Sequence, residues 1–387
     1  MKKWFVWPVL LAGVLCACGA QPTGQSAVAL PMNTERPVVT DLPADEAGPT
    51  PEPTPAAETT LTAADLTLEE KVGQLFIIRP DSLDLTLPQE QIDDAKADGV
   101  TELTDAMRDA LQKYPVGGVC QFGKNIVDPE QITAFNAALQ EASDIPLFIS
   151  VDEEGGAVAR LANKDTFELP RYESAAAVGA EGADAACAMG QTIGGYLRTY
   201  GFNMDFAPDA AEAADCAAAM ARGLAGEGIL PTFKHFPGHG DTAEDSHTGL
   251  AYSYRTVEEL TACELLPFEA AAEVGPRAVM VGHIVVPELT GDLPATLCAD
   301  AIALVPDAEN TLIVTDSLAM GAITDSYTPG EAAVQALQAG CDVLLMPDGL
   351  ADAYDAVLAA VQNGTLSEDR LDLSVNKILR MKAQFCA

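Results

Sequence analysis

Residues 278–283 are Ala-Val-Met-Val-Gly-His, and residues 312–316 are Leu-Ile-Val-Thr-Asp. Each is a short apolar run that ends in a polar side chain, which is typical of a buried strand. Six further short, mostly apolar runs are predicted strands: Val72–Ile78, Gly118–Phe122, Leu147–Asp152, Asn203–Ala207, Thr232–His235 and Val343–Met346. Helical patterns lie between several of them: Pro129–Ala142, Ala183–Thr199, Val257–Glu273 and Pro329–Gln338. Short strands that alternate with helical crossovers favour a parallel sheet covered on both faces.

Two α/β folds accommodate such strands, a (β/α)₈ barrel and an open doubly wound sheet. Five polar residues fall at or just beyond the predicted strand ends: Asp152, Lys234, His235, His283 and Asp316. In a barrel these ends meet at one mouth, whereas in an open sheet they are spread along an edge. We therefore predict a single (β/α)₈ barrel of the TIM type over residues 63–387, preceded by a disordered N-terminal tether.

The charge balance excludes a nucleic-acid-binding protein that works through a basic surface. The 387 residues include 21 Lys and Arg against 58 Asp and Glu, which gives a formal charge of −37. Phosphate neutralisation needs clustered basic side chains. We therefore expect no nucleic-acid partner. No apolar run reaches the roughly 18 residues typical of a membrane-spanning helix, which argues against a polytopic membrane protein.

The first residues have the pattern of an export signal. Lys2 and Lys3 precede an apolar stretch, Trp4–Ala17, which is too short to span a bilayer. The stretch ends in Leu15-Cys16-Ala17-Cys18, which resembles a bacterial lipobox. We expect a signal peptide over residues 1–17, lipidation of Cys18 and an extracytoplasmic protein anchored to the cell membrane. Plain secretion with cleavage nearby is the alternative.

Residues 18–62 are rich in Pro, Thr, Ala and acidic residues, with prolines at 22, 31, 37, 43, 49, 51, 53 and 55. Such a segment buries too little apolar surface to offset its ordering entropy, so we predict a disordered linker. The seven cysteines after Cys18 are scattered and form no Cys-x-x-Cys pair. A disulfide framework or a zinc–cysteine site is therefore not expected.

The densest group of functional side chains lies in residues 234–247, Lys-His-Phe-Pro-Gly-His-Gly-Asp-Thr-Ala-Glu-Asp-Ser-His. Asp245 and His247 are two residues apart, so the carboxylate can orient the imidazole and favour its protonated form. That pair suits a general acid. A surface loop with incidental histidines is one alternative. A metal site is another, although no cysteine lies near and no metal is expected.

This segment resembles the signature of the family 3 glycoside hydrolases, in the β-N-acetylglucosaminidase branch that trims peptidoglycan sugars. Further ordered motifs carry the resemblance, among them Asp-Glu-Glu-Gly-Gly at 152–156, Asn-Met-Asp-Phe-Ala-Pro at 203–208 and Val-Thr-Asp-Ser-Leu at 314–318. It implies a retaining glycosidase without a cofactor, whose substrate is an N-acetylglucosamine-containing glycan. It makes Asp316 the nucleophile and His247 the general acid/base with Asp245 as its partner. It also makes Asp152, Arg160, Lys234 and His235 the groups that hold the sugar hydroxyls.

The chain departs from the family pattern after Asp209, where a long loop with an Arg-Ser-Phe element is usual. Here Asp209 runs almost directly into Ala210-Ala211-Glu212-Ala213, so one substrate-binding arginine has no counterpart. We expect weaker binding or an altered specificity. Two alternative functions remain: a catalytically weak or inactive sugar-binding lipoprotein of the same fold, and a β-glucosidase of the same family.

Overall fold

The computed structural model describes residues 61–210, 213–239 and 249–386. The predicted signal peptide, Cys18 and almost all of the linker lie outside the described residues, and so do Asp245 and His247. Within the described ranges no helix has the length and apolar character needed to span a membrane.

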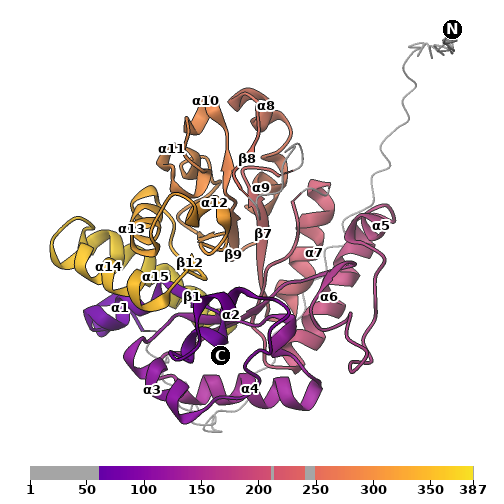
Figure 1. Cartoon of the computed structure of the whole chain (residues 1–387). Coiled ribbons are helices and arrows are strands. Elements are labelled where there is room, and N and C mark those ends of the chain that lie inside the picture. The colour runs from indigo at the N-terminus through magenta and orange to yellow at the C-terminus, as the bar shows by residue number, and fades with distance from the viewer. Residues whose placement is uncertain (1–60, 211–212, 240–248, 387) are drawn as a thin grey trace, which may run out of the picture. The chain divides into compact units, whose positions relative to one another are not determined.

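Eight parallel strands form the central sheet, in the order β11-β9-β7-β6-β3-β2-β1-β12 (Figure 1). A bridge between Val314 and Val343 joins the two ends of this order, so the sheet closes on itself. The strands are β1 Phe76–Ile78, β2 Gly118–Cys120, β3 Phe148–Val151, β6 Met204–Asp205, β7 Leu230–Phe236, β9 Arg277–Val281, β11 Thr311–Thr315 and β12 Leu344–Leu345. The prediction of a (β/α)₈ barrel is confirmed, and all eight predicted strands are present.

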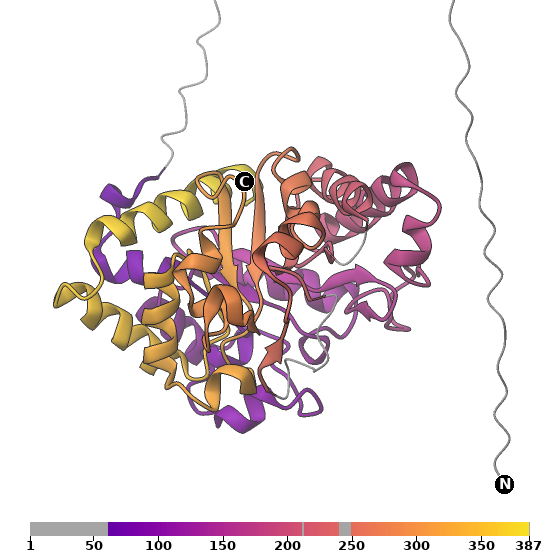
Figure 2. The same ribbon diagram turned by 90° about the horizontal axis from the view of Figure 1, so that it is seen from above.

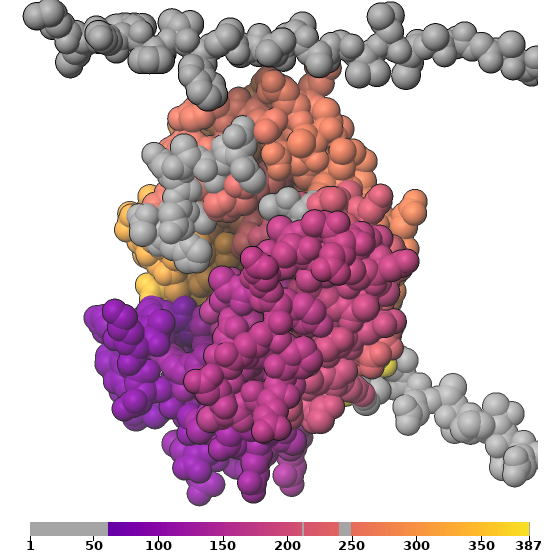
Figure 3. All heavy atoms as spheres, turned by 90° about the vertical axis from the view of Figure 1, so that its right-hand side faces the viewer, coloured from indigo at the N-terminus to yellow at the C-terminus, as the bar shows by residue number. Residues whose placement is uncertain are grey.

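Helices surround this barrel, as the view from above shows (Figure 2). The longer ones are α1 Leu68–Gln74, α3 Asp105–Lys113, α4 Pro129–Ala142, α6 Ala183–Thr199, α7 Ala214–Gly226, α8 Val257–Ala262, α9 Leu266–Ala271, α13 Pro329–Ala339, α14 Leu350–Gln362 and α15 Glu368–Phe385. Figure 3 shows the face formed by α5 (Ala175–Gly179), α6 and α7.

Shorter elements lie in the connections between these strands and helices. They are the helices α2 Gln89–Asp93, α10 Pro287–Thr290, α11 Ala299–Ile302 and α12 Gly321–Thr324, and the 3₁₀ turns Ala63–Asp65, Pro80–Leu83, Gly123–Asn125 and Ala295–Leu297. Two small sheets follow barrel strands. One is the antiparallel hairpin of β4 (Glu153–Gly155) and β5 (Val158–Ala159), and the other pairs β8 (Ala251–Tyr252) with β10 (Ile284–Val285).

Local capping chemistry explains why the helices α4 and α13 begin where predicted. The Asp128 carboxylate accepts a hydrogen bond from the Gln131 amide at 2.9 Å, directly before Pro129 at the first helical position. Thr328 and Glu331 form a capping box in front of α13, again with a proline first. Because these side chains satisfy amides that have no partner inside the helix, they fix the start of each helix.

Two predicted elements were wrong in extent. The predicted strand Val72–Ile78 is helical as far as Gln74, because a Thr67–Glu70 capping box starts α1 at Leu68. An apolar run alone does not separate a buried helix from a buried strand. The predicted helix Val257–Glu273 is two helices, because Pro267 lacks the amide proton that a continuous helix needs.

Candidate active site

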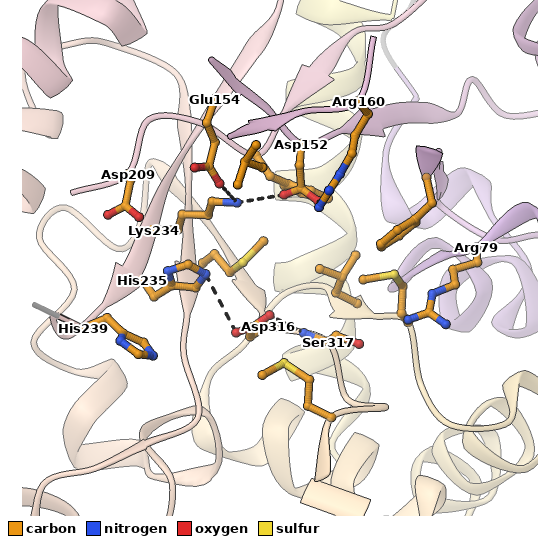
Figure 4. A pocket seen from close by; sticks show the side chains of 17 residues that line it. Arg79, Asp152, Glu154, Arg160, Asp209, Lys234, His235, His239, Asp316 and Ser317 are labelled. Atoms are coloured by element: carbon orange, nitrogen blue, oxygen red, sulfur yellow. Dashed lines mark hydrogen bonds and ion pairs between the residues drawn. The ribbon is translucent and has the colours of Figure 1, made fainter. Parts of the chain in front are cut away.

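A cavity of about 470 Å³ opens at the carboxyl ends of the barrel strands. Asp152, Arg160, Lys234, His235 and Asp316, five of the residues singled out in the sequence, all line it (Figure 4). Asp152 follows β3, Asp316 follows β11, and Lys234 and His235 belong to β7. The barrel therefore brings together residues that are up to 164 positions apart in the chain (316 − 152).

Lys234 and His235 are neighbours on one strand, yet both line the cavity. Successive side chains of a regular strand point to opposite faces. The register of β7 against β9 shifts between Phe233 and Phe236, and such an irregularity redirects side chains locally. This interruption of β7 explains how two consecutive residues contribute to one site.

Lys234 is the centre of a buried ion cluster. Its Nζ lies 2.8 Å from Asp152 Oδ1 and 2.6 Å from Glu154 Oε1. Arg160 Nη2 lies 3.3 Å from the other oxygen of Asp152. Burial alone would lower the pKa of Lys234, but the two carboxylates raise it above its usual value, so the ammonium stays charged.

The carboxylates in this cluster respond differently to the same cation. Burial would raise the pKa of Asp152, but Lys234 and Arg160 outweigh it and hold the pKa below its ordinary value. For Glu154 burial wins and raises the pKa despite Lys234. Asp152 is therefore the more strongly ionised of the two, which suits an acceptor for sugar hydroxyls.

Glu154 was missed in the sequence, although strand alternation could have found it. Asp152 and Glu154 are two residues apart and share a face, whereas Glu153 between them points away. Glu153 is buried and accepts hydrogen bonds from the Leu161 and Ala162 amides at 2.8 and 2.9 Å. Glu153 thus holds the loop after the β4–β5 hairpin, while its neighbours form the cavity wall.

Asp316 lies across the cavity from this cluster (Figure 4). Its Oδ1 accepts a hydrogen bond from the Ser317 amide at 2.7 Å, and its Oδ2 lies 4.0 Å from His235 Nε2. Burial lowers the pKa of His235, and the nearby Asp316 only partly offsets this, so the ring is neutral at pH 7. One oxygen of Asp316 is held by the backbone and the other faces the cavity.

Several polar side-chain atoms around the cavity are buried and lack a hydrogen-bond partner within the described residues. They are Arg160 Nε, His235 Nδ1, Ser317 Oγ and Arg79 Nε. A buried donor without a partner costs free energy, on the order of 1–3 kcal/mol. A polar ligand in the cavity would recover that cost.

The chain matches the family model described as "Glycosyl hydrolase family 3 N terminal domain" over residues 67–219 and 209–381. The chain belongs to glycosyl hydrolase family 3. A similar relative is the beta-hexosaminidase of Stenotrophomonas maltophilia (strain R551-3), which is 33% identical over 69% of this chain and 86% of its own length. Beta-hexosaminidase LpqI of Mycobacterium tuberculosis is 29% identical over 95% of this chain and 94% of its own.

Solved structures agree with these relatives. A glycoside hydrolase family 3 beta-N-acetylglucosaminidase from Paenibacillus sp. str. FPU-7 superposes with a TM-score of 0.71 at 35% identity, over 82% of this chain and 62% of that one. The family 3 hydrolase described here also spans only 56% of Beta-hexosaminidase A from Pseudoalteromonas piscicida. The expectation of a glycosidase of the β-hexosaminidase type, acting on carbohydrate, is confirmed by these comparisons.

His283 was expected among the residues of the mouth, but it does not line the cavity of this family 3 hydrolase. It follows β9, yet its side chain is fully buried, 0% exposed. Both ring nitrogens are engaged, with Thr296 Oγ1 and with the Ser317 carbonyl oxygen, each at 2.8 Å. The prediction that His283 lies at the end of a strand is correct, but its side chain points into the protein interior and not into the cavity.

No role was predicted for the further residues of the cavity wall, which are Arg79, Phe122, Asp209, His239, Met280, Met320 and Met346. Arg79 directly follows β1, so its position at the carboxyl end of a strand, which pointed to Asp316, could have identified it as well. Its guanidinium stacks on Phe122, 5.0 Å from the ring centre, and Arg160 lies 5.8 Å from the same centre. Two cations therefore share one aromatic ring at this edge of the cavity.

The connection after β6 is short, as the sequence indicated. It runs from Phe206 to Ala213 before α7 begins, with residues 211–212 outside the described part. Among the described residues, no group of three or more His, Cys, Asp or Glu side chains is placed to hold a metal ion.

Proposed function

We propose that this protein hydrolyses terminal β-linked N-acetylglucosamine from oligosaccharides of the peptidoglycan type, with retention of anomeric configuration. Asp316 is the nucleophile, His247 the general acid/base and Asp245 its partner. The observation that carries the proposal is the carboxylate of Asp316, whose Oδ2 faces a cavity lined on its other side by Asp152, Arg160 and Lys234. The roles of His247 and Asp245 rest on the resemblance of residues 234–247 to the family signature.

The reaction takes two steps. Asp316 Oδ2 attacks C1 of the sugar, the C1–O bond to the leaving group breaks, and protonated His247 gives its proton to the leaving oxygen. Neutral His247 then takes a proton from water, whose oxygen displaces Asp316 and returns the carboxylate. The Ser317 amide at 2.7 Å keeps Oδ1 occupied, which supports Oδ2 as the attacking atom.

Asp152, Arg160, Lys234 and His235 hold the sugar hydroxyls. Ionised Asp152 accepts from a hydroxyl, while Lys234 and Arg160 donate. His235 Nδ1 and Arg160 Nε, which are buried without partners within the described residues, supply further polar contacts. Glu154 keeps Lys234 in place through its 2.6 Å contact. A neutral, rigid sugar fits this set of donors and acceptors better than a flexible charged ligand.

Turnover of a chromogenic β-N-acetylglucosaminide, measured beside the matching β-glucoside, tests the proposal. We expect hydrolysis of the first with a clear preference over the second. A preference for the glucoside would make the protein a β-glucosidase of the same fold. Binding of N-acetylglucosamine without turnover of either substrate would make it a sugar-binding protein.

We also propose that the protein is exported, cleaved before Cys18 and held at the outer side of the cell membrane by lipid on Cys18. The sequence from Lys2 to Cys18 and the Pro-rich linker support this. Acyl chains contribute about 0.8 kcal/mol per buried methylene, so several chains suffice for stable anchoring. Radiolabelled fatty acid should enter the wild type but not Cys18→Ser, which should appear in the soluble fraction. Equal labelling of both proteins would contradict the anchor.

A further inference from the structure

A buried chain of hydrogen bonds leads from the protein interior to Asp316. Thr296 Oγ1 lies 2.8 Å from His283 Nδ1, and His283 Nε2 lies 2.8 Å from the Ser317 carbonyl oxygen. The Ser317 amide in turn donates to Asp316 Oδ1 at 2.7 Å. One residue, Ser317, is thus held by His283 at its carbonyl and holds the carboxylate of Asp316 with its amide.

The chemistry of the Ser317 carbonyl fixes the direction of the hydrogen bond between His283 and Ser317. A carbonyl oxygen only accepts, so His283 carries a hydrogen on Nε2 and donates it to Ser317. Nδ1 contacts the Thr296 hydroxyl, whose single hydrogen also has a carbonyl acceptor at Val281, 3.1 Å away. Thr296 Oγ1 also lies 2.8 Å from the Gly282 carbonyl oxygen, which ties it to the end of β9. The imidazole is therefore fixed in position and in orientation.

No substrate can reach His283 directly. The side chain is 0% exposed, it does not line the cavity, and Thr296 beside it is also fully buried. Among the described residues, the contact that links His283 to Asp316 runs through the backbone of Ser317. The turn that carries Ser317 has further anchors, because the Asp316 amide donates to Val281 and the Leu318 amide to Leu345, each at 2.9 Å.

We propose that His283 and Thr296 are positioning residues for the nucleophile: through Ser317 they set the rotamer of Asp316 that leaves Oδ2 facing the cavity. This inference rests on the proposed function, in which Asp316 attacks C1. A misplacement of about 1 Å at a reacting atom can cost on the order of 10²-fold in rate. The contribution of His283 should therefore appear in kcat, since substrate hydroxyls bind at Asp152, Arg160 and Lys234.

The test compares substitutions that remove these hydrogen bonds with substitutions at the same positions that keep a donor group. His283→Leu removes the contacts with Thr296 and Ser317, and His283→Gln keeps a side-chain amide able to donate to Ser317. Thr296→Val removes only the hydroxyl, and Thr296→Ser restores it. Thr290→Val is the matched control, because Thr290 is a buried threonine on α10 whose hydroxyl, among the described residues, contacts its own turn at Val286.

We expect kcat on the chromogenic N-acetylglucosaminide to fall about 10- to 100-fold in His283→Leu and about 3- to 10-fold in Thr296→Val. KM and the inhibition constant of N-acetylglucosamine should stay within about threefold, because the sugar-binding residues are untouched. His283→Gln and Thr296→Ser should recover most of the loss. Covalent labelling of Asp316 by an activated fluorinated glycoside should slow by the same factors, measured by mass spectrometry.

A merely structural role predicts a different pattern. Thr290→Val would then lower kcat as much as Thr296→Val at an equal loss of melting temperature, and that result would overturn the inference. So would a folded His283→Leu with kcat within about twofold of the wild type. If His283→Leu does not fold, the kcat values of Thr296→Val and Thr296→Ser test the inference in its place. A wild type that turns over no N-acetylglucosaminide contradicts the proposed function instead, and the labelling rates still test the positioning of Asp316.

Discussion

Two buried lysines lie at opposite ends of the barrel, and their surroundings differ. Lys234, 4% exposed at the mouth, contacts two carboxylates at 2.8 and 2.6 Å. Lys382, 3% exposed on α15, meets Gln74 Oε1 at 2.5 Å and the ring of Phe148 with a 5.3 Å separation. Gln74 precedes β1 and Phe148 begins β3, so this second site lies at the amino ends of the strands.

The difference shows what each end of the barrel is built for. Carboxylates raise the pKa of Lys234 at the mouth, where a charged donor can serve a ligand. Burial lowers the pKa of Lys382 to about 7, because a neutral amide and an aromatic ring compensate a positive charge poorly. Substitutions at the mouth should therefore change activity. Substitutions at the amino ends of the strands, which form the floor of the barrel, should change stability alone.

The largest effect is expected from Asp316→Ala. The variant should fold normally, because the barrel does not depend on one side chain at its mouth, but it should lose at least about 10³-fold in kcat. Activity assays and thermal melting check the two halves of this expectation. Near-native turnover would show that Asp316 is not the nucleophile.

Lys234→Met should affect both activity and stability. It leaves Glu154 buried without its cation and Asp152 with Arg160 alone, which costs about 3–5 kcal/mol of unfolding free energy. The loss of a charge-assisted donor to the sugar should lower kcat/KM by at least about 100-fold. Denaturant unfolding and steady-state kinetics measure both. A variant as stable as the wild type would mean that the ion cluster is not buried in solution.

Lys382→Met is the matched substitution at the floor of the barrel, and it should raise the free energy of unfolding, whereas Lys234→Met lowers it. The unfolded chain holds the lysine proton up to its ordinary pKa near 10.5, whereas the folded chain releases it near 7. The wild type therefore gains stability as pH rises from about 7 to 10.5 and carries the full penalty below 7. The variant should be more stable by on the order of 3 kcal/mol at pH 6, with the gain shrinking toward pH 10. Its kcat should stay within about twofold of the wild type.

A stability gain for Lys382→Met that does not change with pH would contradict this account of the floor. It would mean that the gain comes from apolar packing rather than from removal of a buried charge. Unfolding curves at pH 6, 8 and 10 separate the two explanations.

The shortened connection after Asp209 should raise KM for small N-acetylglucosaminides. An arginine that grips the sugar contributes about 1.5–3 kcal/mol per charge-assisted hydrogen bond, so its absence weakens binding by about 10- to 100-fold. Grafting a family-length loop with Arg-Ser-Phe after Asp209 should lower KM by a similar factor. Saturation of the unmodified protein in the low micromolar range would indicate that another residue, with Arg79 the first candidate on the cavity wall, supplies the contact.

The smallest effect is expected from Asp245→Asn. If Asp245 stabilises protonated His247, its removal lowers the pKa of the acid, and the alkaline limb of kcat/KM moves to lower pH by about one unit. The pH–rate profile of the variant beside the wild type measures this. An alkaline limb at the same pH in both proteins would mean that Asp245 does not act on His247.

The fold was predictable because its signals are local. Apolar runs found every barrel strand, and two helical patterns agree with α4 and α13 to within one residue, where the structure has caps at Asp128 and Thr328. Two predictions were wrong for one reason: the strand was extended over Val72–Gln74, and the helix was continued through Cys263–Leu265. The periodicity of apolar residues does not show where a cap starts a helix or a proline interrupts one.

The candidate site was predictable in part. Residues at strand ends could be found because the barrel places those ends together, as it does for Asp152 and Asp316. The direction of a side chain beyond a strand end could not be predicted, which is why His283 was placed at the mouth, whereas Glu154 was within reach of strand alternation from Asp152. Lys382 carries no sequence signal at all, because its burial depends on how α15 packs against the floor of the barrel.

Covalent trapping tests the central claim most directly. The wild type is incubated with an activated fluorinated N-acetylglucosaminide that slows release of the glycosyl-enzyme, then digested and sequenced by mass spectrometry. We predict one added sugar on the peptide that contains Thr315, Asp316 and Ser317, with the label on Asp316 and none in Asp316→Ala. A label on any other residue, or hydrolysis of the natural-type substrate with inversion and no trapped sugar, would contradict the account.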